Sequence, residues 1–169
     1  GADAFNTDNV RLFSGGGDII MRGTGSRVTN IGAGILLRDG VGINSGTGRI
    51  IMDARGSSWV GLENAPWDGN KVSTITSAAA GGTAISIYGS SESSGGVFMA
   101  NRSGFNSAAG YRILATGSGG ISITGRSNTQ NAVYIGGAQI HALSGAINID
   151  GGLRTLELFS SKIGGLTSD

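Results

Sequence analysis

The chain has 169 residues, with 12 basic and 11 acidic side chains, a formal net charge of +1 and no cysteine. This composition excludes disulfides, cysteine catalysis and cysteine metal sites, and the balanced charge argues against nucleic acid or an anionic membrane as the main partner. No run of 18 apolar residues occurs, so no membrane-spanning helix is expected. Glycine contributes 33 residues, roughly three times its average share of about 7%, which together with short alternating apolar runs predicts many short strands joined by tight turns.

Three series of strands recur along the chain in a fixed order. Series a is built on Ile-x-Ile or Ile-x-Met, and its first inward residues are Ile19, Ile50, Ile85, Ile121 and Ile147. Series b comes next, with expected inward residues Ile35, Val60, Val97, Val133 and Leu156. Series c precedes each member of series a, with anchors at Leu12, Ile43, Ile75, Ile113 and Ile140, and a sixth at Ile163. Each c anchor lies 7 to 10 residues before the next a anchor, which indicates a structural repeat.

A recurring order of three short strands predicts an all-β fold, a parallel β-helix of about five three-stranded turns with partial turns at both ends. One turn cannot bury its own apolar face, whereas stacked turns bury a continuous core. A β-sandwich or an up-and-down barrel is the alternative, but both favour hairpins, and the strand order here shows no mirror symmetry. We therefore expect residues 1–169 to form a single β-helical segment.

Alternation within each strand predicts which side chains face the core. In series a, the first and third residues point inward, as for Ile121 and Ile123, and the residues between and after them form two outer columns. In series b, the expected outward residues are Leu36, Phe98 and Tyr134.

Residues that support catalysis or metal binding are few and scattered. Asp18, Asp53 and Asp150 lie beside series a on different turns, Asp39 follows Arg38, and no segment holds a carboxylate cluster that would converge on a calcium ion. The one histidine, His141, follows an inward residue and should face solvent without a second ligand beside it. The glycine-rich loops lack the lysine and the strand–turn–helix context of phosphate or dinucleotide sites. The sequence predicts no catalytic residue, no metal site and no cofactor.

Two insertions interrupt the repeat between series b and series c, at Glu63–Lys71 and Asn101–Gly110. They leave from the same corner on neighbouring turns and should lie side by side, and loops on a rigid scaffold commonly carry binding function. The candidate binding residues are Trp67, Asp68, Asn70, Phe105 and Asn106. The alternative is that the two aromatic residues fold down and cover the sheet. Asn101-Arg102-Ser103 is a possible glycosylation sequon.

The repeats at 17–56 and 120–151 resemble the passenger repeats of filamentous-haemagglutinin-like exoproteins, the secreted adhesins of the two-partner secretion pathway in Gram-negative bacteria. The resemblance implies a right-handed β-helix, export through an outer-membrane secretion partner, and adhesion to cells or surfaces. The family's secretion domain carries asparagine-proline-asparagine motifs, and the single proline here, Pro66, is in no such motif. We therefore expect an internal piece of a longer shaft.

The function expected from these observations is structural and adhesive, not enzymatic. The chain would be a secreted or surface-exposed shaft segment that displays loops to a host-cell protein or glycan. A β-helical enzyme acting on polysaccharide, the stalk of a contact-dependent toxin-delivery exoprotein, and a spacer without a ligand remain as alternatives. Convergent carboxylates and basic residues on one face would distinguish the enzyme.

Overall fold

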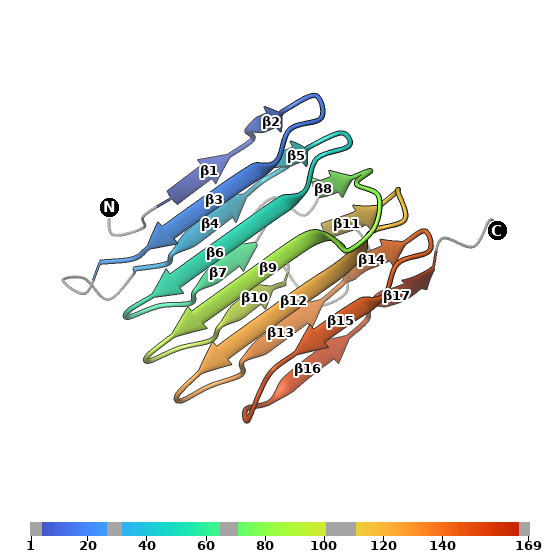
Figure 1. Ribbon diagram of the computed structural model, residues 1–169. Coiled ribbons are helices and arrows are strands. Elements are labelled where there is room, and N and C mark those ends of the chain that lie inside the picture. Colours follow the sequence, from blue (N-terminus) through green and yellow to red (C-terminus); the bar gives the residue numbers. More distant parts are fainter. Residues whose placement is uncertain (1–4, 27–31, 65–70, 101–110, 166–169) are drawn as a thin grey trace.

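The computed structural model describes residues 5–26, 32–64, 71–100 and 111–165, where it has 17 strands and no helix. The strands form three parallel sheets that wrap around one core (Figure 1). We name the sheets a, b and c after the strand series of the sequence.

The bounds of the strands are as follows. The a sheet contains β3 (Ile19–Thr24), β6 (Ile50–Gly56), β9 (Thr83–Ser91), β12 (Gly120–Ser127) and β15 (Ile147–Asp150). The b sheet contains β1 (Phe5–Asp8), β4 (Ile35–Arg38), β7 (Leu62–Asn64), β10 (Val97–Met99), β13 (Val133–Gly136) and β16 (Leu156–Phe159). The c sheet contains β2 (Arg11–Phe13), β5 (Gly42–Asn44), β8 (Ser73–Ser77), β11 (Tyr111–Ala115), β14 (Ala138–Ala142) and β17 (Lys162–Gly165).

Each strand pairs in parallel with the strand three positions along the chain, so the path is a coil of about five turns. Figure 1 shows the chain running to the left along the a sheet in front and returning to the right along the b and c sheets behind, while it descends from the N-terminus to the C-terminus. That path is right-handed, the hand that parallel crossovers adopt almost without exception. The predicted right-handed parallel β-helix is confirmed.

The core consists of stacked isoleucines and related side chains that occupy equivalent positions on successive turns. In the a sheet the five predicted anchors pair in register, from Ile19 to Ile147. In the c sheet all six anchors do the same, from Leu12 to Ile163. Inward side chains of the middle turns are fully buried in one apolar cluster, whereas Ile147 and Ile149 of β15 are only half-buried because no described turn covers them.

One predicted anchor of series b is wrong. Val60 was expected in the core column of the b sheet, but the residue that pairs with Ile35 and Val97 there is Leu62. Val60 and Leu62 have the same parity, so alternation alone cannot separate them. Spacing does separate them, because Leu62 lies 12 residues after Ile50, as Val97 does after Ile85 and Val133 after Ile121.

Val60 belongs instead to a small second cluster on the outside of the b sheet. It packs there with Ala33 and Leu36, and Trp59 and Phe98 cover them. Leu36 faces away from the main core, as predicted, yet it is buried because these side chains enclose it. The sequence also did not predict β1, which pairs with β4 and adds a sixth strand to the b sheet.

The b-to-c corner is a tight left-handed turn wherever it carries no insertion. The residues at this corner have positive φ at Asn9, Asp39, Gly40, Gly137 and Ser160. Asparagine, aspartate and glycine tolerate this conformation best. Asp39 therefore has a conformational role in a turn, in agreement with the prediction that it is a turn residue. The other two corners, after β7 and after β10, are the places where the inserted segments leave the coil.

A charged side chain at a central inward position should unfold the coil. We expect Ile123→Asp, in β12, to lower the free energy of unfolding by more than about 4 kcal/mol, because it buries an unpaired carboxylate in the apolar cluster. The neighbouring outward change Ser122→Asp is the control and should stay within about 0.5 kcal/mol. Denaturant unfolding followed by circular dichroism measures both, and equal effects would contradict the facing of β12.

Gly125 in the same strand is required by a close approach of two backbones. A Cβ atom at this position would lie 1.9 Å from the carbonyl oxygen of Ala132, and nothing flexible there can yield. We expect Gly125→Ala to destabilise the coil by several kcal/mol, in the upper range for point substitutions of about 0.5–3 kcal/mol or above it. Gly164→Ala is the matched control, since a Cβ at Gly164 meets open space. A similar melting temperature for both variants would exclude the close approach.

Candidate functional site

The two inserted segments begin and end at neighbouring positions of the coil. Asn64 at the end of β7 pairs with Met99 of β10, and Ser73 of β8 pairs with Tyr111 of β11. The ends of the segments are thus adjacent, as expected. Glu63 and Asn64, which were assigned to the first insertion, are part of β7. The predicted binding residues Trp67, Asp68, Asn70, Phe105 and Asn106, and the sequon residue Asn101, lie outside the described residues.

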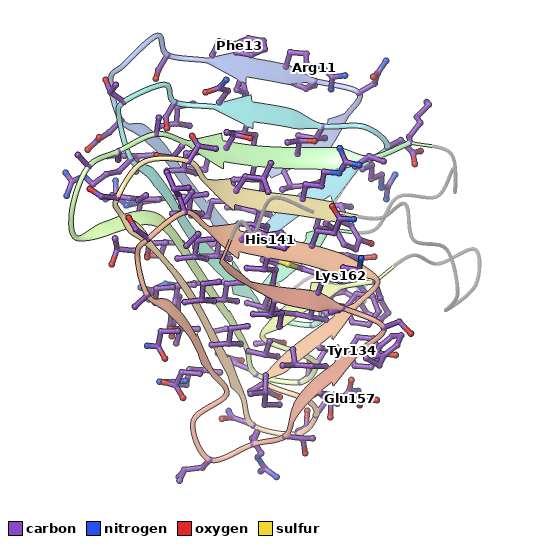
Figure 2. All side chains as sticks on the ribbon, turned by 90° about the vertical axis from the view of Figure 1, so that its right-hand side faces the viewer. Arg11, Phe13, Tyr134, His141, Glu157 and Lys162 are labelled. Atoms are coloured by element: carbon purple, nitrogen blue, oxygen red, sulfur yellow. The ribbon has the colours of Figure 1, made fainter. Side chains whose placement is uncertain are left out.

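Beside these segments, the outer surface of the b sheet carries an aromatic and acidic stripe. Its central column contains Leu36, Glu63, Phe98, Tyr134 and Glu157 on successive strands. Trp59 and Phe159 flank the column. We call Trp59, Glu63, Phe98, Tyr134, Glu157 and Phe159 the aromatic face. Figure 2 shows Tyr134 and Glu157 at the side of the coil, pointing away from the core.

The rings of the aromatic face pack on one another at the spacing of the strands. Phe98 and Tyr134 stack with centroids 4.9 Å apart and an interplanar angle of 4°, and Tyr134 contacts Phe159 at 5.1 Å and 58°. Phe159 lies over Gly136, where a Cβ atom would fall 2.0 Å from its ring. The rings therefore form a continuous ladder that presents its edges to solvent. Aromatic side chains held in this way provide rigid contact area at low entropic cost.

Trp59 and Glu63 form a hydrogen-bonded pair at one end of the aromatic face. The indole Nε1 of Trp59 donates to Oε2 of Glu63 at 2.7 Å, and Glu63 is only 2% exposed. Burying a carboxylate is costly unless hydrogen bonds compensate for lost water. This bond fixes the indole against the second apolar cluster, so the carboxylate serves to orient an aromatic side chain.

Glu157 lies at the other end and is accessible to solvent. Its Oε2 accepts a hydrogen bond from Nδ2 of Asn131 at 2.9 Å. Partial burial, with a further contribution from the charge of Glu157, raises the pKa of Tyr134 above its ordinary value. Burial together with the charge of Glu63 raises the pKa of Tyr111 as well. Both phenols therefore stay neutral at physiological pH, and the aromatic face presents carboxylates as its negative charges.

The two carboxylates of the aromatic face do not form a pair for acid–base catalysis. Glu63 and Glu157 are three strands apart in one column, so their backbones are separated by about 14 Å. Glycosidases place two carboxyl groups about 5–9.5 Å apart. Two aromatic rings fill the interval here, an arrangement that suits contact with a surface rather than attack on a bond.

The aspartates considered as candidate acids are engaged in ion pairs on separate turns. Asp18 bonds Arg49 at 2.8 Å, Asp53 bonds Arg55 at 3.3 Å, and Asp150 bonds Arg126 at 2.7 Å. Hydrogen bonds from the arginine side chains hold the pKa values of Asp18 and Asp150 below the ordinary range. These aspartates are therefore charged, and each one links two positions of the coil surface.

His141 and the metal-binding residue types have no clustered arrangement in the described part of the chain. His141 lies in an outward column of the c sheet, as predicted, with Nδ1 3.4 Å from the carbonyl oxygen of Gly165. Within the described residues, no group of three or more histidine, cysteine, aspartate or glutamate side chains comes together. Nor do those residues contain a helix with the length and apolarity to cross a bilayer.

Sequence reasoning identified two members of the aromatic face, Phe98 and Tyr134, as outward residues but did not connect them to a site. The pairing of Trp59 with Glu63 was missed because both lie within the segment "WVGLE", which was read with the wrong anchor. The correct spacing of 12 residues from Ile50 would have placed Glu63 beside Phe98. No local signal indicates the position of Phe159, which depends on the absence of a side chain at Gly136.

Removing the indole donor should destabilise the aromatic face. We expect Trp59→Phe to lower the free energy of unfolding by about 1–3 kcal/mol, because the buried Oε2 of Glu63 loses its donor. Glu63→Gln keeps an acceptor for the indole, so it should cost less. Tyr88→Phe, on the outer surface of β9, is a control expected within about 0.5 kcal/mol. Denaturant titration decides, and equal values for Trp59→Phe and Tyr88→Phe would exclude the proposed pairing energy.

Comparisons with protein-family models, with curated proteins and with solved structures found no match. The structure is consistent with a parallel β-helical repeat protein, and the resemblance to filamentous-haemagglutinin-like repeats rests on the sequence pattern alone.

Proposed function

We propose that this chain is a shaft segment of a secreted, surface-exposed bacterial adhesin of the filamentous-haemagglutinin-like type, and that the aromatic face is its contact surface for a host-cell protein or glycan. The observation that carries the proposal is the rigid ladder of Phe98, Tyr134 and Phe159 on the outside of an otherwise fully packed coil. In this proposal the longer chain is exported through an outer-membrane secretion partner.

The architecture supports a mechanical role. Every inward position of the middle turns is filled by stacked apolar side chains, and adjacent turns are joined by parallel strand pairing throughout the three sheets. Such a coil transmits load along its axis because each turn contacts only its neighbours and all of them are joined alike. The lack of cysteine suits a chain that crosses membranes unfolded and folds outside the cell without disulfides.

The surface chemistry supports a contact role. Tyrosine, tryptophan and phenylalanine are enriched in protein interfaces, and a few such residues supply most of the binding energy. On the aromatic face they are already ordered by stacking and by the bond between Trp59 and Glu63. A partner therefore loses little entropy by binding there, since the contact residues are preorganised.

Beads coated with the chain test this function on cultured epithelial cells. We expect Phe98→Ala combined with Tyr134→Ala to reduce the affinity of the coated beads roughly tenfold or more, as for a pair of central interface residues. Tyr88→Ala, an aromatic change on the a sheet, is the matched control and should bind like the unchanged chain. Thermal melting must show that the coil persists, and Tyr134→Ala alone provides a milder variant.

Two results would contradict the proposal. If the unchanged chain does not retain beads on cells, this segment is a spacer. If the double variant binds as well as the Tyr88→Ala control, the contact surface lies elsewhere. Trp67→Ala with Phe105→Ala then measures the contribution of the inserted segments, which stays a prediction of the sequence.

A further inference from the structure

The outer face of the c sheet differs from the aromatic face in its charge. Its six strands contain no aspartate or glutamate, whereas Arg11, Arg112 and Lys162 all point outward and are exposed. The b sheet has the opposite balance, with Glu63 and Glu157 in its outward column. Figure 2 looks onto the c sheet and shows Arg11 and Phe13 on its first strand and Lys162 on its last. The coil therefore separates its charges between faces.

The outward residues of this face form two columns that run along the coil axis. One column contains, on successive strands, Arg11, Gly42, Thr74, Arg112, Gln139 and Lys162. The other contains Phe13, Asn44, Thr76, Leu114, His141 and Gly164. Cations thus alternate with hydroxyl and amide side chains, which can exchange hydrogen bonds with a polar ligand.

A hollow of about 240 Å³ opens at the first strands of this face, with Arg11, Phe13, Asn44, Thr74 and Thr76 among its walls. Whole small-molecule sites usually enclose about 300–1,000 Å³, so this hollow has room for one unit of a longer ligand. Phe13 is 70% exposed and offers an apolar ring at the rim. An aromatic ring beside hydroxyl and amide groups matches a sugar, which has an apolar C–H face and polar edges.

Arg11 is positioned at this hollow by its own neighbours. Its Nη1 donates to the carbonyl oxygen of Gly40. Its side chain lies across Gly42, where a Cβ atom would come within 2.7 Å of the Cδ atom of Arg11. Glycine at position 42 therefore allows the guanidinium to rest over the sheet. A guanidinium held in place is a planar, permanently charged donor that recognises carboxylates through paired hydrogen bonds.

We propose that the outer face of the c sheet binds a linear polysaccharide whose sugars carry carboxylates, with one acidic sugar in the hollow between Arg11 and Phe13 and further units along Arg112 and Lys162. This inference rests on the proposed contact function of the coil but uses a different face. Phe13 packs against the sugar ring, Arg11 binds its carboxylate, and Asn44 and Thr74 bind hydroxyl groups.

The spacing of the cations distinguishes this ligand from a nucleic acid. Arg11 and Arg112 are three strands apart, and Arg112 and Lys162 are two strands apart, which corresponds to about 14 Å and about 10 Å at a strand spacing near 4.8 Å. A nucleic-acid strand carries one phosphate per about 3.4 Å of duplex axis and requires a denser row of cations. A sugar chain that bears its charges on separate units is a better match to sparse cations separated by hydroxyl groups.

Isothermal titration of the chain with polygalacturonate oligomers tests the proposal. The fully methyl-esterified oligomer is the matched ligand control, because it keeps the sugar but loses the charge. We expect measurable binding of the acid form, with no detectable binding of the ester. Arg11→Gln should weaken the affinity about tenfold, the effect of losing one hydrogen-bonded charge pair. Arg22→Gln on the a sheet removes the same charge and should change it less than about twofold.

Gly42→Ala separates positioning from overall charge. The new methyl group displaces Arg11 from the sheet surface, while the net charge of the chain is unchanged. The φ angle of Gly42 is not among the positive ones, so alanine is compatible with the backbone. We expect Gly42→Ala and Phe13→Ala each to weaken binding several-fold, with circular dichroism spectra that match the unchanged chain.

Three outcomes would overturn the inference. The acid oligomer may fail to bind the unchanged chain; Arg22→Gln may weaken binding as much as Arg11→Gln; or single-stranded oligothymidylate of equal charge may bind as tightly as the oligomer. The last two results indicate unspecific attraction between polyanions and the coil. None of them bears on the aromatic face, whose cell-binding assay uses Phe98 and Tyr134 and leaves the c sheet unchanged.

Discussion

The structure depends on one constraint, the in-register hydrogen bonding of each turn to the next. Parallel strands bond at a spacing of about 4.8 Å, so residues that follow one another along the axis must be similar in shape and polarity. This is why isoleucine stacks on isoleucine through the a sheet and the c sheet. A single unlike residue at an inward position disturbs the turns above and below it, because the core is continuous and close-packed.

The same constraint leaves the exterior free to vary. Outward residues of one column touch only their neighbours in that column, and the three sheets face different directions (Figure 1). As a result, each face has its own chemistry. The a sheet carries opposite charges bonded in pairs, such as Asp150 with Arg126. The b sheet carries the aromatic face, and the c sheet carries cations with hydroxyl and amide groups between them.

This division explains how a repetitive coil can hold more than one contact surface. The aromatic face is apolar and acidic, so it suits a partner that offers apolar or basic groups. The c sheet lacks carboxylates in its strands and suits an acidic one. Because the faces share a rigid core but no side chains, a change on one surface leaves the other intact. Function in such a fold is determined by outward columns and by insertions, not by the fold itself.

The sequence by itself determined the coil, because the inward residues repeat at spacings that only stacked parallel strands satisfy. Series a and c were predicted residue by residue, and the facing of their strands followed from alternation. The anchor in "WVGLE" was wrong because two apolar residues of the same parity compete for one position. The binding residues predicted in the insertions lie outside the described residues and stay predictions.

Only the tertiary structure decided which outward residues meet. Trp59 bonds Glu63, Phe98 stacks on Tyr134 from another turn, and Arg11 folds across Gly42. These contacts join residues of different turns, or depend on side-chain directions that a strand pattern does not specify. The physical reason is that hydrophobic burial constrains inward positions strongly, whereas outward positions are solvated and their contacts are set by register, by the missing side chains of glycine and by single hydrogen bonds.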